Sequence, residues 1–168
     1  ENDSKKLRGA IITFVGGQTP DLDRIYDIAQ KYGIILIEDC RSSLGAYYKG
    51  KRVGNLRADM TIFSTNPSNS KYAISRSGII VTNNEEIASR AKLLRTHALT
   101  TTYDSYGNLD YVYDVVDIGH KYDLSELDAA YALAQLNKTE RFIKRRKEIA
   151  KLYESRLSGV KHITILPH

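Results

Sequence analysis

The chain contains two short apolar runs, 10–15 (AIITFV) and 34–39 (IILIED), separated by a segment with the spacing of an amphipathic helix. Thr19 and Pro20 are typical of a helix N-cap and first turn, and Gly33 is typical of a helix end. This strand, helix, strand order predicts two parallel neighbours joined by a right-handed crossover. Because both runs are continuously apolar, we expect an α/β sheet that is covered on both faces.

Three more elements are predicted in the middle of the chain. Strands are expected at 60–64 (MTIFS) and 78–83 (GIIVTN). A helix is expected to begin at Asn84, because an asparagine side chain can accept hydrogen bonds from the first helical turn. The following residues, 96–122, are rich in Tyr, Asp and Gly with little periodicity, so we expect a long irregular excursion there.

Two helices are predicted in the last third of the chain. Asp123 and Glu126 have the spacing of a capping box, and they predict a helix that continues through Leu136. The residues from 137 to 157 predict a second helix, and Gly159 is typical of its end.

The net charge of +5 lies entirely in 137–157, which holds eight Lys or Arg and three Glu, whereas the rest of the chain has seventeen charges of each sign. Glu140, Glu148 and Glu154 are interleaved with these cations at spacings that allow i,i+3 or i,i+4 pairs. A nucleic-acid-binding helix is the alternative, but such helices normally add aromatic or amide side chains that read the bases. We therefore expect a solvated helix face and no nucleic-acid partner.

Cys40 is the only cysteine among 168 residues, which excludes a disulfide scaffold and fits a reducing compartment. No apolar run approaches the roughly 20 residues that a membrane helix needs, and residues 1–6 (ENDSKK) lack a signal-peptide core. We therefore expect a cytoplasmic protein without a membrane partner. Because both ends lie close to predicted strands, we also expect the chain to be part of a larger domain.

Two stretches are candidates for chemistry. Glu38 and Asp39 stand at the carboxyl end of a predicted strand, where open α/β sheets bind ligands. A buried Asp39 stays ionised if it meets a cation such as a protonated ring nitrogen; a helix or turn cap is the alternative. The loop 64–71 (STNPSNSK) has hydroxyls and amides that can hold a phosphate. Lys71 in that loop could form a Schiff base, with a surface lysine as the alternative.

Other chemistries are not indicated. His97 and His120 have no further ligand at metal spacing, so we expect no metal site. The sequence contains no GxGxxG, P-loop or nucleophile elbow. The default interpretation of Cys40 is a small buried hydrophobe.

The order of these segments resembles the central part of the DegT/DnrJ/EryC1/StrS family, the pyridoxal-phosphate-dependent sugar aminotransferases of fold type I. The matching stretches are colinear over nearly the whole chain: GGQTPDLDRIYDIAQKYGIILIEDC, LGAYYKGKRVGNLRADMTIFS, GIIVTNNEEIASRAKLLRTHA and IGHKYDLSELDAAYALAQLNKTERFIKRRKEIAKLY. The resemblance implies that residues 1–136 form part of the large domain, a three-layer α/β/α sheet that binds pyridoxal 5'-phosphate. Residues 137–168 would then be a linking helix and the start of the small domain.

Carried over position by position, the resemblance gives Asp39 the pairing with the cofactor's pyridine nitrogen and Ser64 a contact with its phosphate. Lys71 stands nearest to the family's Schiff-base lysine, two residues farther from Ser64 than is usual. Ser42 stands where the family has a His or Gln that packs on the cofactor ring. Lys121 replaces an asparagine that reaches the phosphate of the partner subunit's cofactor, a group that a cation can still bind.

The implied reaction moves an amino group from an amino acid such as glutamate to a nucleotide-linked keto-sugar, in polysaccharide biosynthesis and by a dimer. Several positions depart from the family pattern: Asp123 replaces an arginine, Ile79 replaces a glycine, and Ser42 and Lys121 differ as described. These departures leave a second interpretation open. The chain could belong to a catalytically degenerate member with a structural or dimerisation role, alone or with a paralogue.

Overall fold

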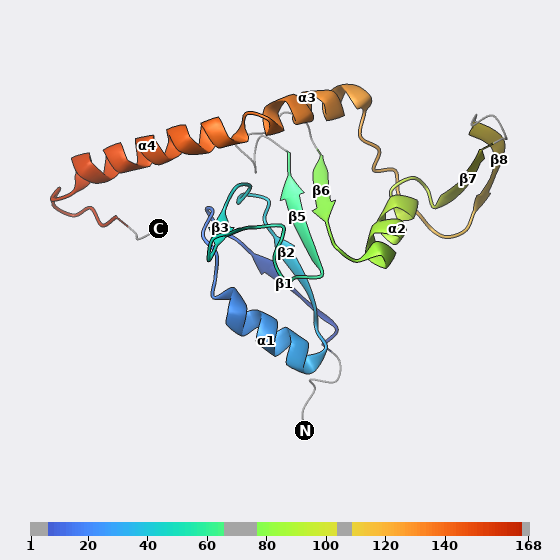
Figure 1. The fold of residues 1–168 in the computed structure, drawn as a ribbon, viewed down its shortest axis with the longest axis horizontal. Helices are drawn as coiled ribbons and strands as arrows, with labels where there is room; N and C mark the ends of the chain where they lie inside the picture. Colours follow the sequence, from blue (N-terminus) through green and yellow to red (C-terminus); the bar gives the residue numbers. More distant parts are fainter. Residues whose placement is uncertain (1–6, 66–76, 104–108, 166–168) are drawn as a thin grey trace.

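The computed structural model describes residues 7–65, 77–103 and 109–165. Its centre is a four-stranded sheet in the order β1 (Gly9–Thr13), β2 (Ile35–Asp39), β5 (Met60–Ser64) and β6 (Gly78–Val81). The first three strands are parallel and β6 runs antiparallel to β5. This confirms the predicted parallel pair. The carboxyl ends of the parallel strands point toward the end of the molecule where α3 (Glu126–Leu136) and α4 (Thr139–Leu157) lie (Figure 1).

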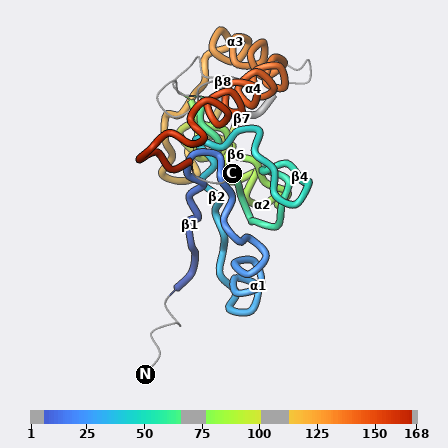
Figure 2. The backbone as a smooth tube through the Cα atoms, turned by 90° about the vertical axis from the view of Figure 1, so that its left-hand side faces the viewer, coloured from blue at the N-terminus to red at the C-terminus, as the bar shows by residue number. Residues whose placement is uncertain are grey.

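Helix α1 (Leu22–Tyr32) is the predicted crossover helix, and it lies beside β1 and β2 (Figure 2). It begins two residues later than Thr19 and Pro20 predict: Asp21 is the N-cap, and its side chain makes no capping bond. Its end agrees with the sequence, because Gly33 adopts the left-handed conformation with φ of 63°. The buried side of α1 meets strand residues to form the core: Phe14, Leu22, Tyr26, Ala29, Leu36, Cys40, Val53 and Phe63.

The two faces of the sheet are not equally covered. Leu36 of β2 and Phe63 of β5 pack in the core with α1, whereas Ile11 of β1 and Ile80 of β6 point to the other face. Ile11 is 67% exposed and Ile80 is 53% exposed. In the described part of this chain, α1 covers one face of the sheet and the other face is exposed at these residues.

A short hairpin connects β2 to β5 and meets α4 (Thr139–Leu157). Its strands are β3 (Tyr47–Tyr48) and β4 (Lys51–Arg52). Arg52 forms an ion pair with Glu140 of α4, and a Cβ added at Gly45 would collide with the Ile143 side chain. The first turns of the basic helix therefore contact the connection between β2 and β5.

The segment from Asn84 to residue 122 is more ordered than the sequence predicts. Asn84 caps α2 (Glu85–Leu94) as expected, because its side chain accepts bonds from the amides of Glu86 and Ile87. The predicted irregular excursion at 96–122 is wrong in part: β7 (Leu99–Tyr103) and β8 (Leu109–Val115) form an antiparallel hairpin. Their β-branched and aromatic residues favour strands, even though they lack a clean alternation.

The chain after β8 returns to the end of α2. The His97 amide donates to the His120 carbonyl at 2.8 Å, and the Tyr122 amide donates to the Arg95 carbonyl at 2.8 Å. A Cβ at Gly119 would collide with the backbone of His97 and of Ala98. The absence of a side chain at Gly119 therefore permits this close approach.

The last two helices are α3 (Glu126–Leu136) and α4. The capping residue of α3 is Ser125 and not Asp123: Ser125 Oγ accepts from the Asp128 amide at 3.1 Å, so the predicted box is displaced by two residues. In α4, Arg145 pairs with Glu148 at 3.0 Å, which is one of the predicted i,i+3 pairs. The predicted boundary after residue 136 falls between the two helices, and the division into two domains stays a prediction. No helix in the described ranges is both long and apolar enough to cross a membrane.

A buried carboxylate connects α1 to the sheet. Glu38 is fully buried and accepts hydrogen bonds from the hydroxyl of Tyr26 on α1 and from Thr61 Oγ1 on β5, the latter at 2.9 Å. Burial, together with the bond to Glu38, raises the pKa of the Tyr26 hydroxyl. Both neighbours donate to its carboxyl oxygens, so this buried polar group is hydrogen-bonded inside the core.

We expect Tyr26→Phe to lower the free energy of unfolding by about 1–3 kcal/mol, because Glu38 then loses one of its two buried donors. Chemical denaturation of the wild type and the variant measures the change. Tyr32→Phe is the matched control, since Tyr32 is on the same helix and 60% exposed. A loss no larger than that of the control would contradict this role of Tyr26.

We expect Gly119→Ala to destabilise the contact between 119–122 and α2 by about 1–3 kcal/mol, because the added methyl group collides with backbone. Hydrogen exchange measures this destabilisation: we expect the amides of His97 and Tyr122 to exchange faster in the variant. Gly78→Ala is the control, since a Cβ there meets only the Phe63 carbonyl oxygen at 3.7 Å. Unchanged protection of both amides would show that the approach is not tight.

Candidate functional site

Asp39 lies at the carboxyl end of β2 and is only 8% exposed. Two side-chain bonds from Arg41 bind its carboxylate: Nε donates to Oδ1 at 2.8 Å and Nη2 donates to Oδ2 at 2.7 Å. The Arg41 amide adds a longer bond to Oδ1, at 3.3 Å. The hydrogen bond from the Arg41 side chain is the main cause that holds the pKa of Asp39 below its usual value. Asp39 is therefore an anion at neutral pH.

Ser64 lies near Asp39, because both residues stand at the carboxyl ends of neighbouring strands. Asp39 pairs in register with Thr13 of β1 and with Ile62 of β5. Ser64 is two residues beyond Ile62, at the end of β5, so it points to the same face as Asp39. Both residues are buried. The parallel pairing of β2 with β5 thus brings two of the sequence-predicted site residues to one edge of the sheet.

Ser42 has a structural contact in the turn that follows β2. Its Oγ donates to the Phe14 carbonyl at 2.9 Å, and Ser43 Oγ donates to the same oxygen at 2.9 Å. The two hydroxyls tie the end of β1 to the turn after Asp39. Cys40 in this turn is fully buried, as expected, and burial, with Glu38 and Asp39 nearby, raises the pKa of its thiol to about 12.

Of the two predicted lysines, only Lys121 belongs to the described residues. Lys71 lies outside the described residues. Lys121 is exposed and forms an isolated antiparallel bridge with Thr96, in the segment that returns to α2. It therefore belongs to a different element from Asp39 and Ser64, and its predicted role toward a partner subunit's cofactor stays a prediction.

Arg41 is the residue that sequence reasoning missed. The sequence predicts that a buried Asp39 stays ionised if it meets a cation such as a protonated ring nitrogen. In the structure, a side chain of this chain is such a cation. The signal was present in the spacing Asp-Cys-Arg, because a turn after the strand lets the side chain of the second following residue fold back. The planar guanidinium then matches both carboxylate oxygens at once.

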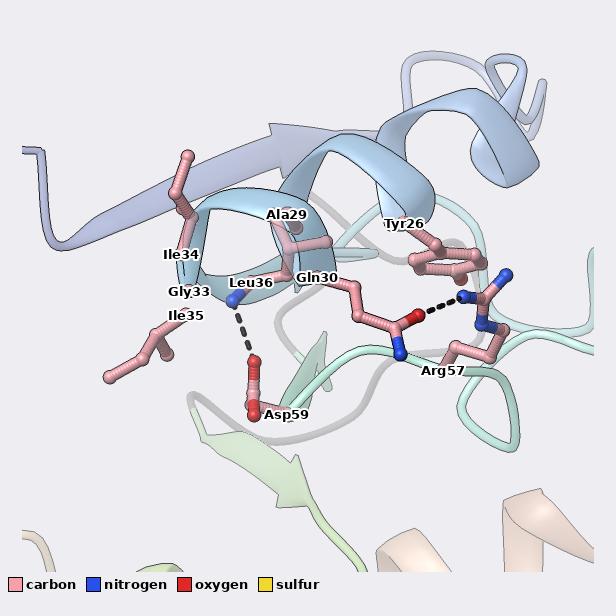
Figure 3. A pocket seen from close by; sticks show the side chains of 9 residues that line it. All are labelled: Tyr26, Ala29, Gln30, Gly33, Ile34, Ile35, Leu36, Arg57 and Asp59. Atoms are coloured by element: carbon pink, nitrogen blue, oxygen red, sulfur yellow. Dashed lines mark hydrogen bonds between the residues drawn. The ribbon is translucent and has the colours of Figure 1, made fainter. Parts of the chain in front are cut away.

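A separate hollow of about 340 Å³ lies at the other end of β2, between α1 and the start of the strand (Figure 3). The Leu36 amide donates to Asp59 Oδ2 at 2.8 Å, and Arg57 Nη2 donates to Gln30 Oε1 at 3.1 Å. Ligands of open α/β sheets bind beyond the carboxyl ends of strands, so we do not assign the site to this hollow. Within the described ranges, no group of three or more His, Cys, Asp or Glu could hold a metal ion.

Known proteins agree with this architecture. An aminotransferase of Helicobacter pylori, PseC, which is involved in the biosynthesis of pseudaminic acid, superposes with a TM-score of 0.84 at 24% identity, covering 94% of this chain and 40% of that one. Spr1654 of Streptococcus pneumoniae in its PLP form superposes with a TM-score of 0.80 at 23% identity, covering 95% of this chain and 45% of that one. These likenesses confirm the predicted fold class, part of a fold-type-I α/β transferase.

Known sequences also match most of this chain. A UDP-4-amino-4,6-dideoxy-N-acetyl-beta-L-altrosamine transaminase of Campylobacter jejuni is 36% identical over 149 residues, which cover 87% of this chain and 37% of that protein. This chain spans less than half the length of each of these relatives. The model of the DegT/DnrJ/EryC1/StrS aminotransferase family matches residues 4–168. The chain belongs to the DegT/DnrJ/EryC1/StrS aminotransferase family.

Proposed function

We propose that this chain forms part of the active site of a pyridoxal-phosphate-dependent aminotransferase that acts on a nucleotide-linked keto-sugar. The observation that carries the proposal is Asp39, a buried and ionised carboxylate at the carboxyl end of a central parallel strand. The transaminase activity of the Campylobacter relative, the PseC likeness and the PLP form of Spr1654 support the reaction class and the cofactor.

The residues on this edge fit the cofactor chemically. A protonated pyridine nitrogen is a cationic N–H donor, and Asp39 is an anionic acceptor in a site that already stabilises its charge. Ser64 carries a hydroxyl, a group that hydrogen-bonds phosphate oxygens, on the same face of the sheet as Asp39. Asp39 therefore suits the ring nitrogen of pyridoxal phosphate, and Ser64 suits its phosphate group.

Each residue then has a defined task. When bound, the cofactor supplies an electron sink for the carbon that loses its proton. Asp39 keeps the proton on the ring nitrogen, and Ser64 orients the phosphate. Lys71 Nζ would hold the cofactor and would move the proton at the reacting carbon. Lys121 binds the phosphate in the partner subunit's site.

The substrates and the assembly follow from the same proposal. An amino acid such as glutamate gives its amino group and leaves as the 2-oxo acid, and the keto-sugar receives that group. We place the enzyme in the cytoplasm, in polysaccharide biosynthesis, as a dimer. Side chains such as Ile118 and Leu127, 87% and 82% exposed, support a subunit contact because they are large and apolar.

One observation favours a second candidate, a catalytically degenerate member with a structural role. The Ser42 hydroxyl is bonded to the Phe14 carbonyl, so this position ties two turns together and offers no ring to stack on the cofactor. The charge at Asp123 is also opposite to that of the arginine which the family resemblance implies. In this candidate the fold and the subunit contact remain, and the chemistry is lost.

We expect pyridoxal phosphate to attach to Lys71 when the full-length protein that contains this chain is incubated with it and reduced with borohydride. Peptide mass mapping locates the attached group. In Lys71→Arg the attachment disappears, because the arginine side chain is not a competent nucleophile at neutral pH. Attachment elsewhere, for example at Lys121, contradicts the assignment of Lys71, and no specific attachment favours the degenerate candidate.

We expect Asp39→Asn to weaken binding of pyridoxamine 5'-phosphate about tenfold or more, because a charge-assisted hydrogen bond becomes a neutral one. Pyridoxamine phosphate cannot attach to a lysine, so calorimetric titration reports only the ring and phosphate contacts. Asp27→Asn is the control, since Asp27, on α1, is an exposed carboxylate that pairs with Arg57. Equal affinities of Asp39→Asn and the wild type would remove Asp39 from the site.

A further inference from the structure

The acceptor atoms that the proposed function assigns to the cofactor are already engaged by a side chain of this protein. Both carboxylate oxygens of Asp39 accept hydrogen bonds from the Arg41 guanidinium, at 2.8 and 2.7 Å. Two parallel bonds of this kind fix the plane of the guanidinium against the plane of the carboxylate. Arg41 is therefore the main cation of this chain that holds the pKa of Asp39 below its usual value.

The two partners of this pair differ in burial. The Asp39 side chain is 11% exposed and held at the end of a central strand, whereas the Arg41 side chain is 55% exposed. Asp39 is thus positioned by the sheet, and Arg41 reaches it from the solvent side of the turn. If the pair separates, water can solvate the exposed guanidinium, whereas the buried carboxylate needs another donor, which a protonated ring nitrogen can supply.

A pyridinium nitrogen needs the same carboxylate. Its single N–H would donate to an oxygen of Asp39. A carboxylate offers about four acceptor sites, and the amide, Nε and Nη2 of Arg41 already take three of those on Asp39. Two cations held against one carboxylate would also repel each other. Binding through Asp39 therefore favours release of at least part of the Arg41 contact.

We propose that Arg41 is an internal competitor for Asp39: it pairs with the carboxylate while the site is empty and swings out when a protonated ring nitrogen binds. This inference rests on the proposed function. Arg41 then acts on affinity through Asp39 and is a positioning residue. The apparent affinity is reduced by the fraction of molecules in which Asp39 is paired with Arg41.

The test measures calorimetric affinity of the full-length protein for two probes, pyridoxamine 5'-phosphate and its analogue with CH in place of the ring nitrogen. We expect Arg41→Ala to bind pyridoxamine phosphate about threefold more tightly than the wild type, because the competing pair is gone. The analogue does not engage Asp39, so its affinity does not rise. Arg41→Gln, which keeps an amide donor without the charge, is a second variant in case the first one folds poorly.

Two controls make the result specific. Arg90→Ala removes an exposed arginine that is paired with Asp117, and it should leave both affinities unchanged. In the Asp39→Asn background, adding Arg41→Ala should produce no gain, because the competition acts only through the carboxylate.

The outcomes separate this inference from the proposed function. Tighter binding by the Arg41 variants, limited to the probe with the ring nitrogen, supports it. Binding by the wild type with no gain in the variants overturns the inference alone. Equal gains for both probes also overturn it, since they would arise without Asp39. No binding to the wild type or to either variant contradicts the proposed function and the inference together.

Discussion

The structure depends on the alternation of side chains along β2. Neighbouring residues of a strand point to opposite faces, so Glu38 and Asp39 are separated although they are adjacent in the chain. Glu38 enters the core and is satisfied by Tyr26 and Thr61. Asp39 faces the other side, beside Ser64 of the neighbouring strand and under Arg41. One strand thus serves the packing of α1 and the chemistry of the site.

Much of the central fold could be predicted because its signals are local. Gly33 ends α1, Asn84 begins α2, and the apolar runs become β1, β2 and β5, since each depends on residues within a few positions. The capping residues of α1 and α3 were displaced by two positions. Several Ser, Thr and Asp side chains near each helix start have the required chemistry, and the backbone geometry decides among them.

The features that could not be predicted depend on contacts between residues far apart in the sequence or on the path of a turn. The β7–β8 hairpin lacks an alternating pattern, and the burial of the outer sheet face depends on what packs there. Asp39 and Ser64 come to the same end of the sheet because β2 pairs with β5, a pairing that the sequence does not predict. The cation that pairs with Asp39 could not be predicted, because the choice between Arg41 and any other cation depends on the path of the turn.

The environment of Cys40 has a consequence for handling the protein. Its thiol is fully buried, and burial, with Glu38 and Asp39 nearby, raises its pKa to about 12 and keeps it protonated at physiological pH. Alkylating reagents and disulfide exchange both require an accessible thiolate. This native cysteine therefore becomes reactive only when the sheet opens around it, and the rate of its modification is a built-in measure of local unfolding at the edge that carries Asp39.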